Sequence, residues 1–131
     1  GAIGKKLYMK VEDLFVKNEI PMVHLSDPVS EVIVEISSKR LGATAVLEND
    51  RLAGMITDGD LRRMLQKHTS IEGITAADIM TRNPRTIDKE TLVVDALSAM
   101  RKNNITQLLV VDGTKYVGVI HLHDILKEGI L

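Results

Sequence analysis

The chain contains no cysteine and no tryptophan, and phenylalanine and tyrosine together supply only 2% of its 131 residues. Without cysteine it has no disulfide bridge, no thiolate zinc site and no cysteine nucleophile. With so few aromatic rings it lacks the stacking surfaces that hold single-stranded nucleic acids. Because 44% of the residues are hydrophobic, a core is possible, and it must be built from aliphatic side chains.

Neither sign of charge is in excess, because 17 lysines and arginines face 18 aspartates and glutamates. The chain therefore has no excess of positive charge that would attract nucleic acid or an anionic membrane surface. No apolar run approaches the roughly 20 residues that span a bilayer. We therefore expect no nucleic-acid or membrane partner, and the lack of cysteine fits a cytoplasmic protein.

The sequence repeats itself with an offset of 64 residues. Gly54-Met55-Ile56 is matched by Gly118-Val119-Ile120, and one residue of slippage aligns Val11 to Phe15 with Ala76 to Met80. The predicted repeats run from 11 to 70 and from 74 to 131. Two apolar stripes with helical spacing also coincide at this offset: Val29, Val32, Ile33 and Ile36 in the first repeat, and Val93, Ala96, Leu97 and Met100 in the second.

Each repeat is predicted to form a short strand, a helix, two strands and a closing helix. Asp27 and Thr91 are expected to cap the first helices, which end near Gly42 and near Asn103-Asn104. Strands and helices interspersed in this way indicate an α/β fold in which helices cover small sheets. Strands are expected at 44–47, 52–56, 108–111 and 116–120, with closing helices from about Asp58 and Leu122.

The segment from Gly54 to Arg63 is the most informative part of the first repeat. Its strand ends at Thr57 and its helix begins at Asp58, so free N–H groups can bind an anion there. Asp60 offers two acceptor oxygens to a diol, and Arg62 and Arg63 can neutralise a phosphate. The alternative is that Thr57 and Asp60 form only a capping box, with the arginines on a solvated helix face.

In the second repeat, His121 replaces the threonine of this motif, followed by His123 and Asp124. These three side chains could hold a metal ion, or one imidazole could hydrogen-bond a ligand or a neighbouring loop. Two nearby histidines without a distant partner are a weak metal signal, so we favour the second interpretation and predict no metal site. The chain has no nucleophile elbow and no glycine-rich phosphate loop, so we predict no catalytic residues.

A repeat of about 60 residues with a Gly-hydrophobic-hydrophobic-Thr/Ser-x-x-Asp motif resembles a CBS domain, and two in tandem resemble a Bateman module. The resemblance implies a pseudo-twofold pair whose sheets pack together and leave two clefts. Such clefts hold adenosyl or other nucleotides, with the motif aspartate on the ribose. His121 departs from this pattern, so the second cleft is expected to bind differently or not at all.

A narrower resemblance is to the C-terminal part of bacterial D-arabinose 5-phosphate isomerases, in which a sugar-isomerase (SIS) domain precedes a CBS pair. It rests on five segments, of which the His-x-His-Asp ending is the most discriminating: Gly4 to Leu7, Val11 to Leu14, Glu19 to Pro21, Thr57 to Arg63 and His121 to Leu126. It implies that residues 1–10 are a linker from an upstream SIS domain, which carries the chemistry, so this fragment itself is not expected to be an enzyme. No cofactor is required, and the expected effector is a nucleotide or CMP-Kdo, the activated sugar of the pathway to Kdo, lipopolysaccharide and capsules.

The pseudo-symmetry implied by the resemblance places segments of both repeats in each cleft. A structural role, as an oligomerisation module that forms a homodimer, is the alternative to ligand sensing. The expected lining of one cleft is Thr57, Asp58, Asp60 and Arg63 with Pro84, Arg85, Thr86, Ile105 and Thr106. The expected lining of the other is His121 and Asp124 with Ile20, Pro21, Met22, Leu41, Gly42 and Ala43.

Overall fold

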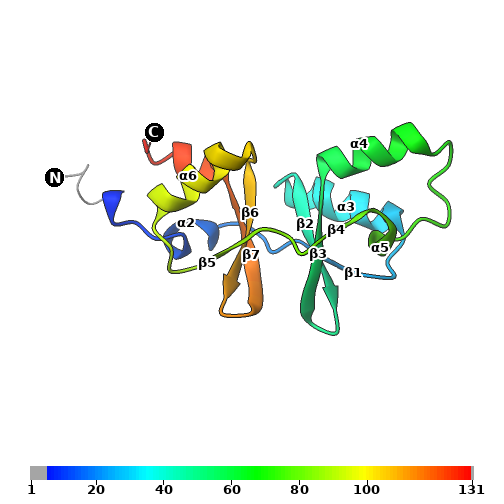
Figure 1. Ribbon diagram of the computed structural model, residues 1–131, viewed down its shortest axis with the longest axis horizontal. Helices are drawn as coiled ribbons and strands as arrows, with labels where there is room; N and C mark the ends of the chain where they lie inside the picture. Colours follow the sequence, from blue (N-terminus) through cyan, green and yellow to red (C-terminus); the bar gives the residue numbers. More distant parts are fainter. Residues whose placement is uncertain (1–5, 131) are drawn as a thin grey trace. The chain divides into compact units, whose positions relative to one another are not determined.

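The computed structural model describes residues 6–130 and shows two compact units. We call them unit 2, which is Ile20–Pro84, and unit 1, which joins the segment before residue 20 to the segment from Arg85 onward. The opening segment of each sequence repeat thus packs in the unit that holds the body of the other repeat. In Figure 1 the blue helix α2 (Glu12–Phe15) accordingly lies beside strand β7 (Lys115–His121).

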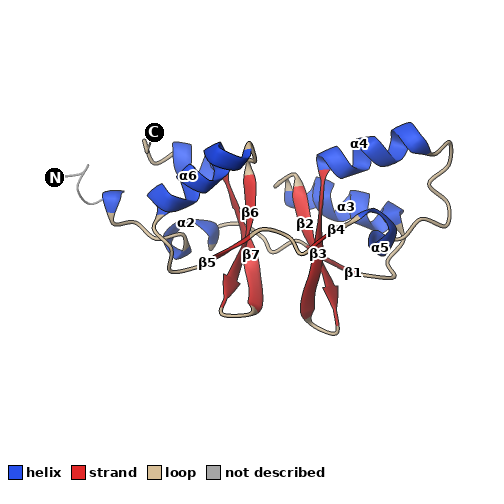
Figure 2. Ribbon diagram, in the orientation of Figure 1, coloured by secondary structure: helices blue, strands red, loops and turns tan. Residues whose placement is uncertain are grey.

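Unit 2 is a two-layer α/β structure in which the helices lie on one side of a four-stranded sheet (Figure 2). The strand order is β1-β2-β3-β4, with β1 parallel to β2 and the other pairs antiparallel. Its elements are β1 (Met22–His24), α3 (Val29–Lys39), β2 (Ala43–Glu48), β3 (Arg51–Thr57), α4 (Asp58–Lys67), α5 (Ala76–Ile79) and β4 (Thr81–Arg82).

Unit 1 has the same plan with a three-stranded sheet in the order β5-β6-β7. The first pair of strands is parallel and the second is antiparallel. Besides α2 and β7, its elements are β5 (Thr86–Asp88), α6 (Val93–Asn103), β6 (Gln107–Asp112) and α7 (Leu122–Leu126). No helix among residues 6–130 is long and apolar enough to cross a bilayer.

The predicted α/β class and order of elements are confirmed, but the predicted helix caps at Asp27 and Thr91 are wrong. The helices begin at Val29 and Val93 without a side-chain cap. Their first N–H groups donate instead to backbone carbonyls of the exchanged opening segments, Val29 N–H to Ile74 at 2.9 Å and Val93 N–H to Met9 at 2.8 Å. Tertiary packing therefore satisfies the donors that a local cap would otherwise satisfy.

The first long helix also ends earlier than predicted. It stops at Lys39, and Arg40 adopts a left-handed conformation with φ 61°, so the chain turns before Gly42. The prediction for the second helix is confirmed, because α6 ends at Asn103 and Asn104 is left-handed with φ 52°. Asparagine tolerates this conformation better than most residues with a side chain.

Each unit has its own aliphatic core beneath its sheet. The predicted stripes supply much of it, since all their members except the half-buried Ile33 are buried. The core of unit 2 contains Val23, Val29, Val32, Ile36, Val46, Ile56, Met64, Ile74 and Ala76. The core of unit 1 contains Val11, Leu14, Phe15, Val93, Ala96, Leu97, Met100, Leu108, Val110, Ile120, Ile125 and Ile130.

The two motif glycines make room for the exchanged segments. A Cβ at Gly118 would lie 2.8 Å from the ring of Phe15, and one at Gly54 would lie 2.6 Å from Met80 Sδ. Real Cβ atoms do not approach other heavy atoms this closely. Phe15 and Met80 are the residues that the one-residue slippage aligned, so the repeated glycine is explained by packing of the opening segment on the strand.

Candidate functional site

In unit 2, Thr57 and Asp60 form a complete capping box at the start of α4. Thr57 N–H donates to Asp60 Oδ2 at 2.9 Å, and Asp60 N–H donates to Thr57 Oγ1 at 3.3 Å. The Thr57 hydroxyl also donates to Asp60 Oδ2 at 3.2 Å. The structural role that the sequence allowed for this motif is therefore present, and a ligand would have to bind a carboxylate that already has partners.

Arg63 holds the other oxygen of the same carboxylate. Its guanidinium donates to Asp60 Oδ1 at 2.7 Å, while the Arg63 side chain is 62% exposed and that of Asp60 only 13% exposed. The ion pair is on the surface, so it contributes little stability, but it places a cation beside the motif aspartate. A pocket of about 250 Å³ adjoins them, lined by Asp60, Arg63, Met64, Lys67, His68, Asp78 and Ile79.

In unit 1, an imidazole replaces the threonine hydroxyl in the cap. His121 Nδ1 accepts the N–H of His123 at 2.9 Å, and His121 N–H donates to Asp124 Oδ2 at 2.8 Å. A ring nitrogen that accepts a hydrogen bond carries no proton, so this arrangement requires neutral His121. The five-residue helix α7 is thus capped at its start in the same way as α4, by a different side chain.

Burial lowers the pKa of His121 below its ordinary value, because the charged ring would lose hydration. Asp124 opposes this shift by attracting the imidazolium, and His123 reinforces it by repulsion. Within residues 6–130, no three His, Asp or Glu side chains are placed to hold a metal ion. The alternative of a metal bound by His121, His123 and Asp124 therefore has no support in the geometry.

A third capping box shows that the Thr-x-x-Asp pattern is not specific to the glycine motif. Thr75 N–H donates to Asp78 Oδ2 at 2.9 Å at the start of α5, and Thr75 Oγ1 donates to the same oxygen at 3.1 Å. The hydrogen bonds from Thr75, the backbone one first, lower the pKa of Asp78. What distinguishes the other two boxes is their position directly after the second strand of an antiparallel pair, β3 in unit 2 and β7 in unit 1.

One residue at the site was missed by sequence reasoning. Asn18, from the opening segment, donates from Nδ2 to Asp124 Oδ2 at 2.9 Å and to the carbonyl of Val119 at 3.1 Å. Extending the alignment of the opening segments by three residues pairs Asn18 with Asn83. A repeated asparagine was the available signal, although the sequence does not show that Asn18 reaches a residue 106 positions away.

The remaining predicted residues fall into local groups within each unit. Ala43 pairs with Thr57 across β2 and β3, and Asp58 N–H donates to Gly42 O at 3.0 Å. In unit 1, Leu122 N–H donates to Thr106 O at 2.7 Å, which places Ile105 and Thr106 beside His121. Pro84 ends unit 2, while Arg85 and Thr86 begin the second segment of unit 1. The predicted pairing of these groups across the two units stays a prediction.

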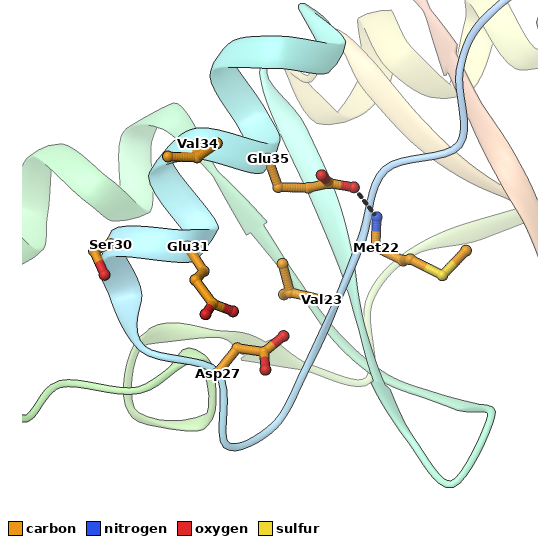
Figure 3. Close-up of a pocket in the computed structure, with 7 residues that line it drawn as sticks. All are labelled: Met22, Val23, Asp27, Ser30, Glu31, Val34 and Glu35. Carbon is orange, nitrogen blue, oxygen red and sulfur yellow. Dashed lines mark hydrogen bonds between the residues drawn. The ribbon is translucent and has the colours of Figure 1, made fainter.

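A larger pocket of about 400 Å³ lies elsewhere in unit 2, between α3 and β1 (Figure 3). Glu35 accepts the N–H of Met22 at 2.8 Å, and Asp27 accepts that of His24 at 2.8 Å. These carboxylates satisfy outward N–H groups of the edge strand β1, which protects that edge from further pairing. Of the predicted ligand-binding residues only Met22 lines this pocket, whose walls are Met22, Val23, Asp27, Ser30, Glu31, Val34 and Glu35.

Comparison with solved structures identifies the fold. A crystal structure of a CBS domain superposes with a TM-score of 0.84 at 20% identity, covering 92% of this chain and 97% of the other. A CBS domain protein from Pyrobaculum aerophilum complexed with AMP superposes with a TM-score of 0.78 at 22% identity, covering 88% and 89%. At these identities the likeness concerns the fold.

Curated relatives give closer sequence matches. Arabinose 5-phosphate isomerase KdsD of Francisella tularensis is 44% identical over 97% of this chain, and KdsD of Yersinia pestis is 38% identical over all of it. The chain spans only 39% and 40% of these relatives' lengths. The CBS domain family itself matches residues 11–67 and 76–130. The chain therefore belongs to the CBS domain family, of which it carries two copies.

Proposed function

We propose that the chain is a ligand-sensing CBS pair that binds a nucleotide or a nucleotide sugar. The observation that carries this proposal is the same arrangement in both units, a motif aspartate in the first turn of a helix that directly follows the second strand of an antiparallel pair. The structures of two proteins with this fold, the CBS domain protein from Pyrobaculum aerophilum and CBSX2, were determined in complex with AMP. A carboxylate suits the vicinal diol of a ribose, and Arg63 supplies a cation for an anionic ligand.

CMP-Kdo is the favoured ligand. The curated relatives are arabinose 5-phosphate isomerases, which the sequence resemblance places at the start of the route to Kdo. A pathway's activated end product is a natural inhibitor of its first enzyme, and CMP-Kdo carries both a ribose diol and anionic groups. The proposed parent is thus a cytoplasmic isomerase whose upstream SIS domain performs the reaction and whose CBS pair regulates it.

A thermal-shift screen of the isolated chain tests ligand sensing. A ligand that binds only the folded state stabilises it by about 2.7 kcal/mol at a hundredfold excess over Kd. We expect CMP-Kdo to raise the melting temperature more than CMP, AMP, ATP or S-adenosylmethionine does. No shift with any of the five compounds would count against sensing. Turnover of ribulose 5-phosphate by this chain would contradict the proposed absence of catalysis.

An oligomerisation module is the second candidate, favoured by exposed leucines on the two motif helices. Leu65 on α4 is 59% exposed and Leu126 on α7 is 42% exposed. The sequence predicts that a subunit interface would use the apolar helix faces Leu61, Met64 and Leu65 in the first repeat and Ile125 and Leu126 in the second. Met64 and Ile125 must be removed from these faces, because they are buried in the cores of their own units. Sedimentation of the chain tests this role: a concentration-independent monomer would eliminate the homodimer for this fragment.

A further inference from the structure

The two motif aspartates differ in where their partners come from. In unit 2 the side-chain partners of Asp60 are Thr57 and Arg63, both within three residues of it. In unit 1 the carboxylate of Asp124 accepts one hydrogen bond from the adjacent His121 and one from Asn18 in the opening segment. Only the second aspartate therefore connects the motif helix to the beginning of the chain.

The orientation of the Asn18 amide is fixed by what it faces. Val119 O and Asp124 Oδ2 are both acceptors, so both N–H groups of Nδ2 are used and the amide cannot be flipped without losing them. Asp124 Oδ2 in turn has two donors, at 2.8 and 2.9 Å, which occupy its two lone pairs. This oxygen has no acceptor capacity left for a ligand while Asn18 is in place.

We propose that Asn18 is a built-in competitor for the ligand at Asp124, and that ligand binding in unit 1 releases the opening segment. This inference rests on the proposed function. A vicinal diol that donates to both carboxylate oxygens needs a lone pair of Oδ2. The N–H of His121 belongs to the cap of α7 and cannot move independently, whereas Asn18 lies in a bend that follows α2. Asn18 is therefore the donor that yields.

The release has a route along the chain. Asn18 N–H donates to Phe15 O at 2.9 Å, and Phe15 packs on Gly118 at the end of α2. Loss of the two amide hydrogen bonds removes one polar contact of this turn with β7, at Val119 O, and one with α7, at Asp124. In unit 2 the matching Asn83 is exposed and has no hydrogen bond from its side chain within residues 6–130. Ligand binding at Asp60 therefore has no equivalent effect on residues 76–83.

Hydrogen exchange of backbone amides, measured with and without AMP as the probe, tests the proposal. In the wild-type chain, saturating AMP is expected to increase exchange at residues 14–19 several-fold, and Asp124→Ala abolishes this AMP-dependent increase. Asn18→Asp places a carboxylate against that of Asp124, so it is expected to increase exchange there without AMP. Asn83→Asp is the matched control: it leaves the exchange of residues 76–83 unchanged, because aspartate also tolerates φ 50°.

Calorimetry supplies an independent measurement. Asn18→Ala removes the competitor, so AMP is expected to bind unit 1 roughly three- to tenfold more tightly, which corresponds to one net hydrogen bond. If AMP binds the wild-type chain but leaves exchange at residues 14–19 unchanged or slower, the release is wrong and the sensing function stands. If neither AMP nor any compound of the thermal-shift screen binds, both proposals are wrong.

Discussion

In unit 2 the motif carboxylate is held by neighbours along the chain, whereas in unit 1 it is also held by a residue 106 positions away. The fold is otherwise repeated closely, including a register shift after Val46 in β2 and after Val110 in β6. The comparison shows that duplication of a fold does not duplicate its connections. A tandem pair can keep one locally built site and connect the other to a distant part of the chain.

The largest expected difference between the two units lies in the packing of their opening segments. Phe15 is buried against Gly118, whereas the matched Met80 is only half-buried against Gly54. We expect Phe15→Ala to lower the free energy of unfolding by about 3–4 kcal/mol and Met80→Ala by about 1–2 kcal/mol. Urea denaturation of the two variants measures the difference, and equal losses would show that both segments are held alike.

The motif aspartates give the second test, in stability. Asp60→Ala removes a capping box and a surface ion pair and is expected to cost about 1 kcal/mol. Asp124→Ala also leaves the half-buried amide of Asn18 without one acceptor, so we expect a cost of about 1–2 kcal/mol. Denaturation of both variants provides the comparison, with Asp78→Ala as the control for a cap outside the motif.

Asp60→Ala and Asp124→Ala also distinguish the ligand affinities of the two units. Asp60 Oδ2 also has two donors, but one of them is the Thr57 hydroxyl, which can rotate away, and no distant partner has to be displaced. With Arg63 beside it as a cation, we expect unit 2 to bind the ligand more tightly. If Asp60 holds a ribose diol, Asp60→Ala weakens binding by about 1.5–3 kcal/mol, at least tenfold in Kd. Calorimetry that finds a loss only for Asp124→Ala would reverse the assignment of the stronger site.

The smallest expected effect is a pH dependence confined to unit 1. The pKa of folded His121 is lowered by burial, so below pH 6.5 the unfolded chain binds more protons and stability falls as the pH falls. Protonation also removes the acceptor at Nδ1 that caps His123 N–H. We expect His121→Thr, which copies Thr57, to reduce the fall of the melting temperature between pH 7.5 and pH 5.5. An unchanged slope would show that His121 does not control it.

The fold was largely predictable because its signals are local. The apolar stripes of the two long helices and the polar turns between strands depend on neighbours a few residues away. The caps at Thr57 and His121 follow from the same short range, although the imidazole cap was not foreseen. The caps expected at Asp27 and Thr91 failed because carbonyls of Ile74 and Met9, far along the chain, accept the helix N–H groups instead.

The sequence by itself determined the repeat, the order of elements, the aliphatic cores and the family, because all of these depend on residue type and short spacing. Only the tertiary structure decided that each opening segment packs in the unit of the other repeat. It also decided that Asn18, and not a neighbour in the sequence, donates the second hydrogen bond to the carboxylate of Asp124. The physical reason is that a hydrogen bond between residues 106 positions apart depends on how α2 and the turn after it pack on β7 and α7, and no spacing along the chain records that.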